Sequence, residues 1–164
     1  MAAAMSVRRP VLAVALAVIW IATVPSAHAQ GIVTVTTPAS VSFTVPNVTV
    51  STTGSPSAAR VSFTFSLVLP IQVLRVSVRA DAATFTSPAT GTPIPASKLT
   101  WTTSNVTNGS GTSGTLSTSY TTLYQANTLQ TSGGADVHWV LGAPGGGIRS
   151  GSHTLTVRYR FEAI

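Results

Sequence analysis

Side chains that could do chemistry are scarce in this chain of 164 residues. It contains nine Lys or Arg, three Asp or Glu and no cysteine. Acid–base catalysis needs positioned titratable groups, and a nucleophile needs an adjacent base. Asp136 and His138 would share one face of a strand, with His153 on a following strand. Catalytic zinc needs three ligands in fixed geometry, and no spaced ligand motif is present. We therefore predict no catalytic site, no metal and no cofactor.

Four arginines form a more informative pattern. Arg75 and Arg79 share one face of a predicted strand, and Arg158 and Arg160 share a face of another. If both strands belong to one sheet, these residues form a basic patch for an anionic envelope polymer or acidic glycan. Glu162, in register with the second pair, would neutralise part of that patch. The alternative role of these arginines is to keep the sheet soluble and to discourage unwanted pairing with strands of other molecules. Nucleic acid is not an expected partner, because lysines are rare and no recognition motif is present.

Three aromatic residues are candidates for stacking on a sugar ring, because glycan-binding modules are usually built around exposed aromatic side chains. The alternative is that each ring belongs to the core. The candidates are Trp101, Tyr120 and Tyr124.

The segments that carry these groups have a sequence pattern that repeats every two residues. Apolar and polar residues alternate along four runs, which predicts strands with one buried face. These runs are residues 61–69, 74–79, 136–141 and 155–162. Further strands are expected near residues 32–37, 41–50, 98–103 and 120–126, and Pro46 indicates an edge strand or a bulge. Loops rich in Gly, Ser and Pro separate the runs. The pattern predicts an all-β chain with a single antiparallel β-sandwich, immunoglobulin-like or Greek-key, of about eight strands.

Two local expectations accompany this fold. The low-complexity stretch 104–115 is predicted to be a mobile loop. The runs 136–141 and 155–162 are predicted to form a C-terminal hairpin, with the apolar face of the last strand in the core. Whether that last strand completes its own sheet or a neighbour's stays open.

The N-terminus has the pattern of a secretory signal. Arg8 and Arg9 precede an apolar run at residues 10–24, and Ala27-His28-Ala29 is a small-x-small cleavage site. The sequence therefore predicts a cleaved signal peptide at residues 1–29 and an exported domain at 30–164. No second long apolar run follows, so no transmembrane anchor is expected after cleavage.

Two segments together resemble the WxL-type surface domain of Gram-positive bacteria. They are "LRVSVRADAATFTSPATGTPIPASKLTW" and "VHWVLGAPGGGIRSGSHTLTVRYRF". Leu74-Arg75-Val76 and Tyr159-Arg160-Phe161 occupy the two motif positions and keep the alternation without the tryptophan. Trp139-Val140-Leu141 spells W-x-L on the preceding strand. The resemblance implies an exported β-sandwich held non-covalently at the cell wall.

The stretch "GSHTLTVRY" is also similar to the last strand of spore-coat-U-like pilus subunits, of the form G-x-x-x-L-x-V-x-Y. That family usually contains cysteines, which this chain lacks. The resemblance implies exchange of strands between neighbouring subunits.

The sequence thus predicts a secreted, non-catalytic β-sandwich protein, associated with the cell envelope, with a structural or adhesive role. A strand-exchanging, pilus-like subunit that self-associates through edge strands is the first alternative. A module that binds a glycan or a wall polymer is the second.

Overall fold

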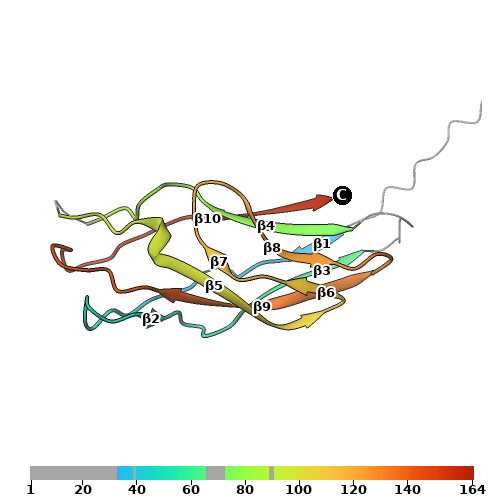
Figure 1. Cartoon of the computed structure of the whole chain (residues 1–164), viewed down its shortest axis with the longest axis horizontal. Helices are drawn as coiled ribbons and strands as arrows, with labels where there is room; N and C mark the ends of the chain where they lie inside the picture. The colour runs from blue at the N-terminus through green and yellow to red at the C-terminus, as the bar shows by residue number, and fades with distance from the viewer. Residues whose placement is uncertain (1–32, 39, 66–72, 89–90) are drawn as a thin grey trace, which may run out of the picture.

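The computed structural model describes residues 33–38, 40–65, 73–88 and 91–164, and the predicted signal peptide lies outside them. The described chain is all-β, as predicted, and its strands form two antiparallel sheets (Figure 1). One sheet has the order β1 (Val33–Thr36), β3 (Ala59–Phe65), β9 (Ser132–Leu141), β5 (Leu99–Thr107) and β7 (Gly114–Thr115), and β2 (Thr52–Thr53) also pairs with β9. The other has the order β10 (Val157–Ala163), β4 (Leu74–Ala80), β8 (Thr121–Ala126) and β6 (Gly109–Gly111). A short 3-10 helix, η1 (Ala96–Lys98), precedes β5.

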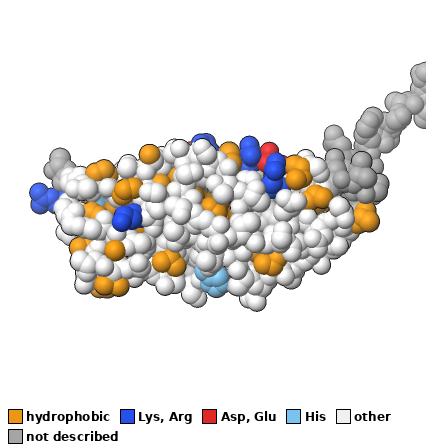
Figure 2. Space-filling model, in the orientation of Figure 1, with side chains coloured by type: hydrophobic (Ala, Val, Ile, Leu, Met, Phe, Trp, Pro, Cys, Tyr) orange, Lys and Arg blue, Asp and Glu red, His pale blue; other side chains and the backbone are white. Residues whose placement is uncertain are grey.

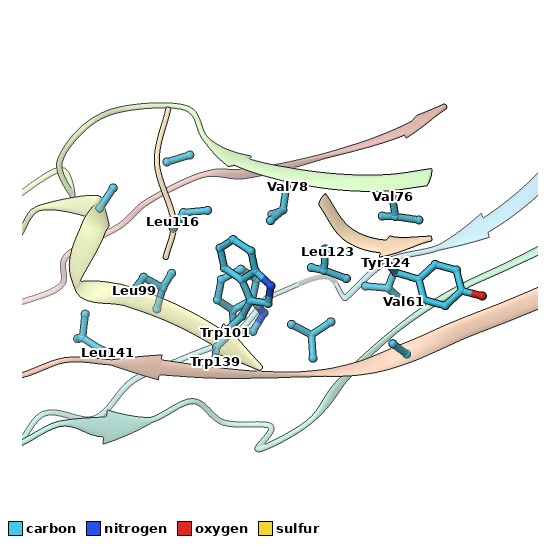
Figure 3. Packing of buried hydrophobic residues seen from close by; sticks show 14 of the residues in the cluster. Val61, Val76, Val78, Leu99, Trp101, Leu116, Leu123, Tyr124, Trp139 and Leu141 are labelled. Atoms are coloured by element: carbon cyan, nitrogen blue, oxygen red, sulfur yellow. The ribbon is translucent and has the colours of Figure 1, made fainter. Parts of the chain in front are cut away.

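Both sheets contribute to one hydrophobic core (Figure 3). Alternation places the apolar side chains of β3, β4 and β9 on their buried faces, as the period of two predicts. Trp101 of β5 and Trp139 of β9 are cross-strand partners, and their ring centroids are 5.8 Å apart. A shared core between two antiparallel sheets is consistent with a β-sandwich. In the described residues no helix is long and apolar enough to cross a bilayer.

The predicted C-terminal hairpin is wrong. β9 lies in the first sheet, whereas β10 lies in the second and pairs with β4 from Val157↔Ala80 to Ala163↔Leu74. The connection 142–156 therefore takes the chain from one sheet to the other. A period-two pattern specifies which face of a strand is buried but not which strand lies beside it, so the pattern alone left the partner undetermined.

The predicted mobile loop at 104–115 is also wrong, because β5 continues to Thr107 and β6 and β7 follow at once. Its small residues serve close packing. A Cβ on Gly114 would lie 2.5 Å from the Trp101 ring. Asn105 and Asn108 adopt positive φ angles of 46° and 55°, a conformation that asparagine tolerates better than most residues.

The strand predicted at 41–50 is reduced to one isolated bridge, between Ser42 and Ser55. The predicted run 61–69 is observed as β3, and its last residues lie outside the described part. The remaining predicted strands correspond to β1, β4, β5, β8, β9 and β10.

Candidate functional site

The final strand, β10, lies at the end of its sheet. Its only strand neighbour in the described sheet order is β4, so its other edge is open (Figure 1). An open strand edge presents backbone N–H and C=O groups that can pair with a further strand.

The hydrogen bonds to β4 show which residues of β10 present those groups. Ile164 and Val73 exchange both backbone hydrogen bonds, at 2.9 and 3.0 Å. Antiparallel partners alternate between bonded and non-bonded pairs, so every second residue before Ile164 is bonded to β4. The backbone groups of Val157, Tyr159 and Phe161 therefore point to the open edge. The side chains of these three residues pack against the core.

The segment 41–45 lies across from this edge and has the same alternation. Ser42 and Ser55 exchange backbone hydrogen bonds of 2.9 and 2.8 Å, so the backbone groups of Val41 and Phe43 point the other way. Val41, Phe43 and Val45 pack against the core and are only half-buried. The two facing segments therefore share one pattern of apolar side chains.

A groove of about 860 Å³ separates these two segments. Phe85, Leu99, Trp139 and Leu141, which belong to the core, also line it. Nine apolar residues pack against the core without being fully buried, and seven of these nine line the groove. The seven are Val41, Phe43, Val45, Ile148, Leu155, Val157 and Tyr159. The incomplete burial of the core is therefore concentrated along one groove, which polar residues such as Arg149 and His153 also line.

Tyr159 is the titratable tyrosine of β10 that lines this groove. Burial raises the pKa of Tyr159 to about 12, and a hydrogen bond with Trp139 acts in the opposite direction. The phenol is thus held in its neutral form against the core.

This pKa predicts a loss of stability at alkaline pH. An unfolded tyrosine loses its proton near pH 10, while folded Tyr159 keeps it to about pH 12. The unfolded state binds fewer protons in this window, so the free energy of unfolding should fall by at most about 2–3 kcal/mol between these two pH values. Urea unfolding from pH 9 to 12 tests this, with Tyr159→Phe as the control that should lose less stability. Parallel losses in both proteins would contradict the assignment.

The condition on which the predicted arginine patch depended is met, because β4 and β10 are adjacent strands of one sheet. Figure 2 shows basic side chains gathered around an acidic one at the edge that these strands form. Asp81 contacts Arg158 at 2.6 Å and Arg79 at 3.5 Å, and we call this set the Asp81 triad. Glu162 contacts Arg160 at 2.9 Å and Arg75 at 3.6 Å, and we call this set the Glu162 triad. The hydrogen bond from Arg158 is the main cause that lowers the pKa of Asp81.

Tyr120 lies within this patch. The guanidinium of Arg160 is 4.2 Å from the Tyr120 ring centroid, and that of Arg79 is 5.1 Å from it, so both make cation–π contacts. Tyr120 is half-buried and stays a candidate for glycan stacking.

The other two stacking candidates are core residues. Trp101 and Tyr124 are each only 1 % exposed, and Figure 3 shows both rings among the packed side chains. A ring buried on both faces has no surface to offer to a sugar. The Tyr124 hydroxyl donates a hydrogen bond of 2.8 Å to the Thr107 carbonyl, and burial raises the pKa of this phenol.

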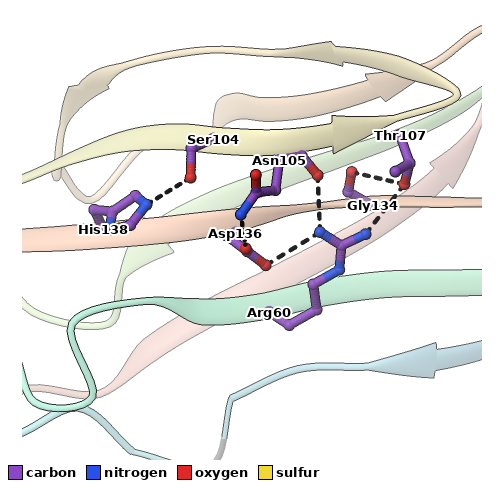
Figure 4. A network of polar contacts seen from close by, with 7 residues as sticks. All are labelled: Arg60, Ser104, Asn105, Thr107, Gly134, Asp136 and His138. Atoms are coloured by element: carbon purple, nitrogen blue, oxygen red, sulfur yellow. Dashed lines mark hydrogen bonds and ion pairs between the residues drawn. The ribbon is translucent and has the colours of Figure 1, made fainter.

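Asp136 and His138 belong to a separate polar network on the outer face of the first sheet (Figure 4). Asp136 accepts a hydrogen bond of 2.7 Å from Asn105 and forms an ion pair with Arg60 at 3.1 Å. The bonds from Asn105 and Arg60 lower the pKa of Asp136. His138 contacts the Ser104 hydroxyl at 2.6 Å, and its other ring nitrogen contacts the Ser57 carbonyl at 2.8 Å.

His153 is not part of that network. Its ring nitrogens contact the Ser87 hydroxyl at 3.2 Å and the Arg149 carbonyl at 2.9 Å, beside the groove. In the part of the chain that the structure describes, no three His, Cys, Asp or Glu side chains gather in a way that could hold a metal ion.

No family model, curated protein or solved structure is similar enough to this chain to count as a match. The resemblances to WxL-type domains and to spore-coat-U-like subunits therefore stay predictions.

The groove was not predicted from the sequence. The signal that could have indicated it is the pair of matching apolar alternations, at residues 41–45 and 155–161. Both alternations suit a core, and neither reveals that a groove lies between them.

Proposed function

We propose that this chain is an exported, non-catalytic structural subunit of the cell surface whose copies assemble by strand addition. An extended segment of one copy would lie along β10 of the next. The observation that supports this most strongly is the groove beside the open edge of β10, where the incompletely buried side chains of the core are concentrated.

A strand suits this groove better than a compact ligand. β10 offers backbone donors and acceptors at every second residue from Val157 to Phe161, and a strand added to a sheet edge binds through such groups. The apolar side chains on both sides of the groove also alternate, so an added strand with apolar residues at every second position would complete the core.

We propose that the occupant is the segment 30–37 of a second copy. Its described part includes β1, Val33–Thr36, which reads Val-Thr-Val-Thr and so alternates as the groove requires. β1 is four residues long and mostly exposed, and Val33 is 40 % exposed where it pairs with β3. Little burial would be lost if β1 left β3 and entered a neighbour's groove.

Donor and acceptor are different surfaces, so each contact would leave a free donor at one end and a free groove at the other. Contacts of this kind build open chains when the rotation between subunits does not close a ring. We therefore expect filaments whose length increases with protein concentration.

Leu155→Glu tests the groove. Leu155 is half-buried and lines the groove, so a carboxylate there would have to be desolvated when a strand is added. We expect this variant to stay monomeric in light scattering and electron microscopy, where the unsubstituted protein forms filaments. Leu129→Glu is the matched control, because Leu129 is 57 % exposed and does not line the groove. Filaments from both variants, or from neither, would contradict the proposal.

A further inference from the structure

We propose that the outer face of β4 and β10 binds an acidic polysaccharide through the arginines of the Asp81 and Glu162 triads. This inference is independent of the proposed strand addition. Side chains of a strand alternate between the two sheet faces, so Arg158 and Arg160 lie on the side opposite to Val157 and Tyr159. A strand added beside β10 would extend the sheet and leave this outer face uncovered.

The charges on this face do not balance. Each triad has two guanidinium groups and one carboxylate, so each has an excess of one positive charge. Arg79 and Arg158 are directly opposite each other in the β4–β10 register. Like charges at such positions destabilise a sheet, and one carboxylate cannot neutralise both. Two of the three acidic residues of the chain lie on this face, and they still leave it a surplus of two positive charges.

The guanidinium groups are held in position and stay partly exposed, although the Nε atoms of Arg75 and Arg79 are buried without a hydrogen-bond partner among the described residues. Tyr120 contacts those of Arg79 and Arg160, and these side chains are 31 % and 44 % exposed. Ser77 points to the same outer face of β4, yet it is only 2 % exposed, which indicates that neighbouring side chains cover it. A packed arginine loses less conformational entropy when it binds, and its planar group can hold a carboxylate with two parallel hydrogen bonds.

An acidic polysaccharide fits this face better than a nucleic acid. Duplex DNA carries one negative charge per about 1.7 Å of its axis, and Asp81 and Glu162 would repel such a density of phosphates. A uronic acid polymer instead spaces single carboxylates between neutral ring atoms. Its carboxylates can pair with the guanidinium groups through two parallel hydrogen bonds.

Calorimetric titration with polygalacturonate at low salt tests the inference, using the protein that begins at Gln30. Arg160→Gln should lower the affinity by about fivefold or more, because it removes one charge and one planar donor group. Lys98→Gln removes the same charge from η1, outside both triads, and should change the affinity by less than about twofold. The affinity should also fall as the salt concentration rises.

Arg160→Lys keeps the charge but loses the planar group, so it should weaken binding by about threefold even if Arg160→Gln fails to fold. Any of three results would overturn the inference. They are no binding of polygalacturonate by the unsubstituted protein, equal effects of Arg160→Gln and Lys98→Gln, and binding of duplex DNA at least as tight as that of polygalacturonate.

Discussion

A chain that lacks residues 30–37 should stay monomeric at concentrations at which the chain beginning at Gln30 forms filaments. The deletion removes the proposed donor and leaves the groove and the β10 edge intact. Analytical ultracentrifugation over a range of concentrations measures the difference. A synthetic peptide with the sequence of residues 30–37 should bind the deletion variant with one-to-one stoichiometry, because each chain has one such groove in the described structure.

Two matched double variants test whether β1 is the donor strand. This question is separate from whether the groove accepts a strand at all. Val33→Ser with Val35→Ser removes the apolar face of β1 and should abolish filaments. Thr34→Ser with Thr36→Ser changes the other face and should leave filaments intact. If the deletion variant still forms filaments and Leu155→Glu does not, the groove accepts a different segment. If the deletion variant polymerises as the chain beginning at Gln30 does and Leu155→Glu does too, assembly by strand addition is wrong.

Trp101→Ala should cause the largest loss of stability, by about 3–5 kcal/mol, which is the usual cost of truncating a buried large aromatic residue. Trp101 is 1 % exposed and packs against Trp139 (Figure 3). Gly114 also lies close to the Trp101 ring. The residues around Trp101 cannot collapse far into the space it leaves, because β5 is held between β9 and β7. Urea unfolding followed by circular dichroism measures the change.

Trp101→Phe is the control for this prediction. The indole N–H of Trp101 is buried and has no hydrogen-bond partner among the described residues. Phenylalanine is smaller than tryptophan, so some packing contacts are lost. It keeps a ring in the core, however, and removes the unpaired donor, which offsets part of the lost stability. Trp101→Phe should therefore lower the free energy of unfolding clearly less than Trp101→Ala does. Equal losses from the two variants, or a loss below about 1 kcal/mol from Trp101→Ala, would contradict this account of the core.

The arginine patch shows how far a local pattern can predict a site. Spacing alone placed Arg75 with Arg79 and Arg158 with Arg160, since residues an even number of positions apart share a strand face. Their union into one surface required β4 and β10 to be neighbours, which the structure shows. The contacts of Tyr120 were less predictable, because this residue precedes β8 and lies near Arg160 of β10 only because both strands flank β4.

The sequence by itself determined the all-β class and the buried face of each main strand, because both depend on the alternation of neighbouring residues. Only the tertiary structure decided that β10 pairs with β4 and not with β9, and that the edge of β10 stays open beside the segment 41–45. These features depend on contacts between residues far apart in the chain. A period of two is the same for a strand in the middle of a sheet and a strand at its edge, so it cannot show where a sheet ends.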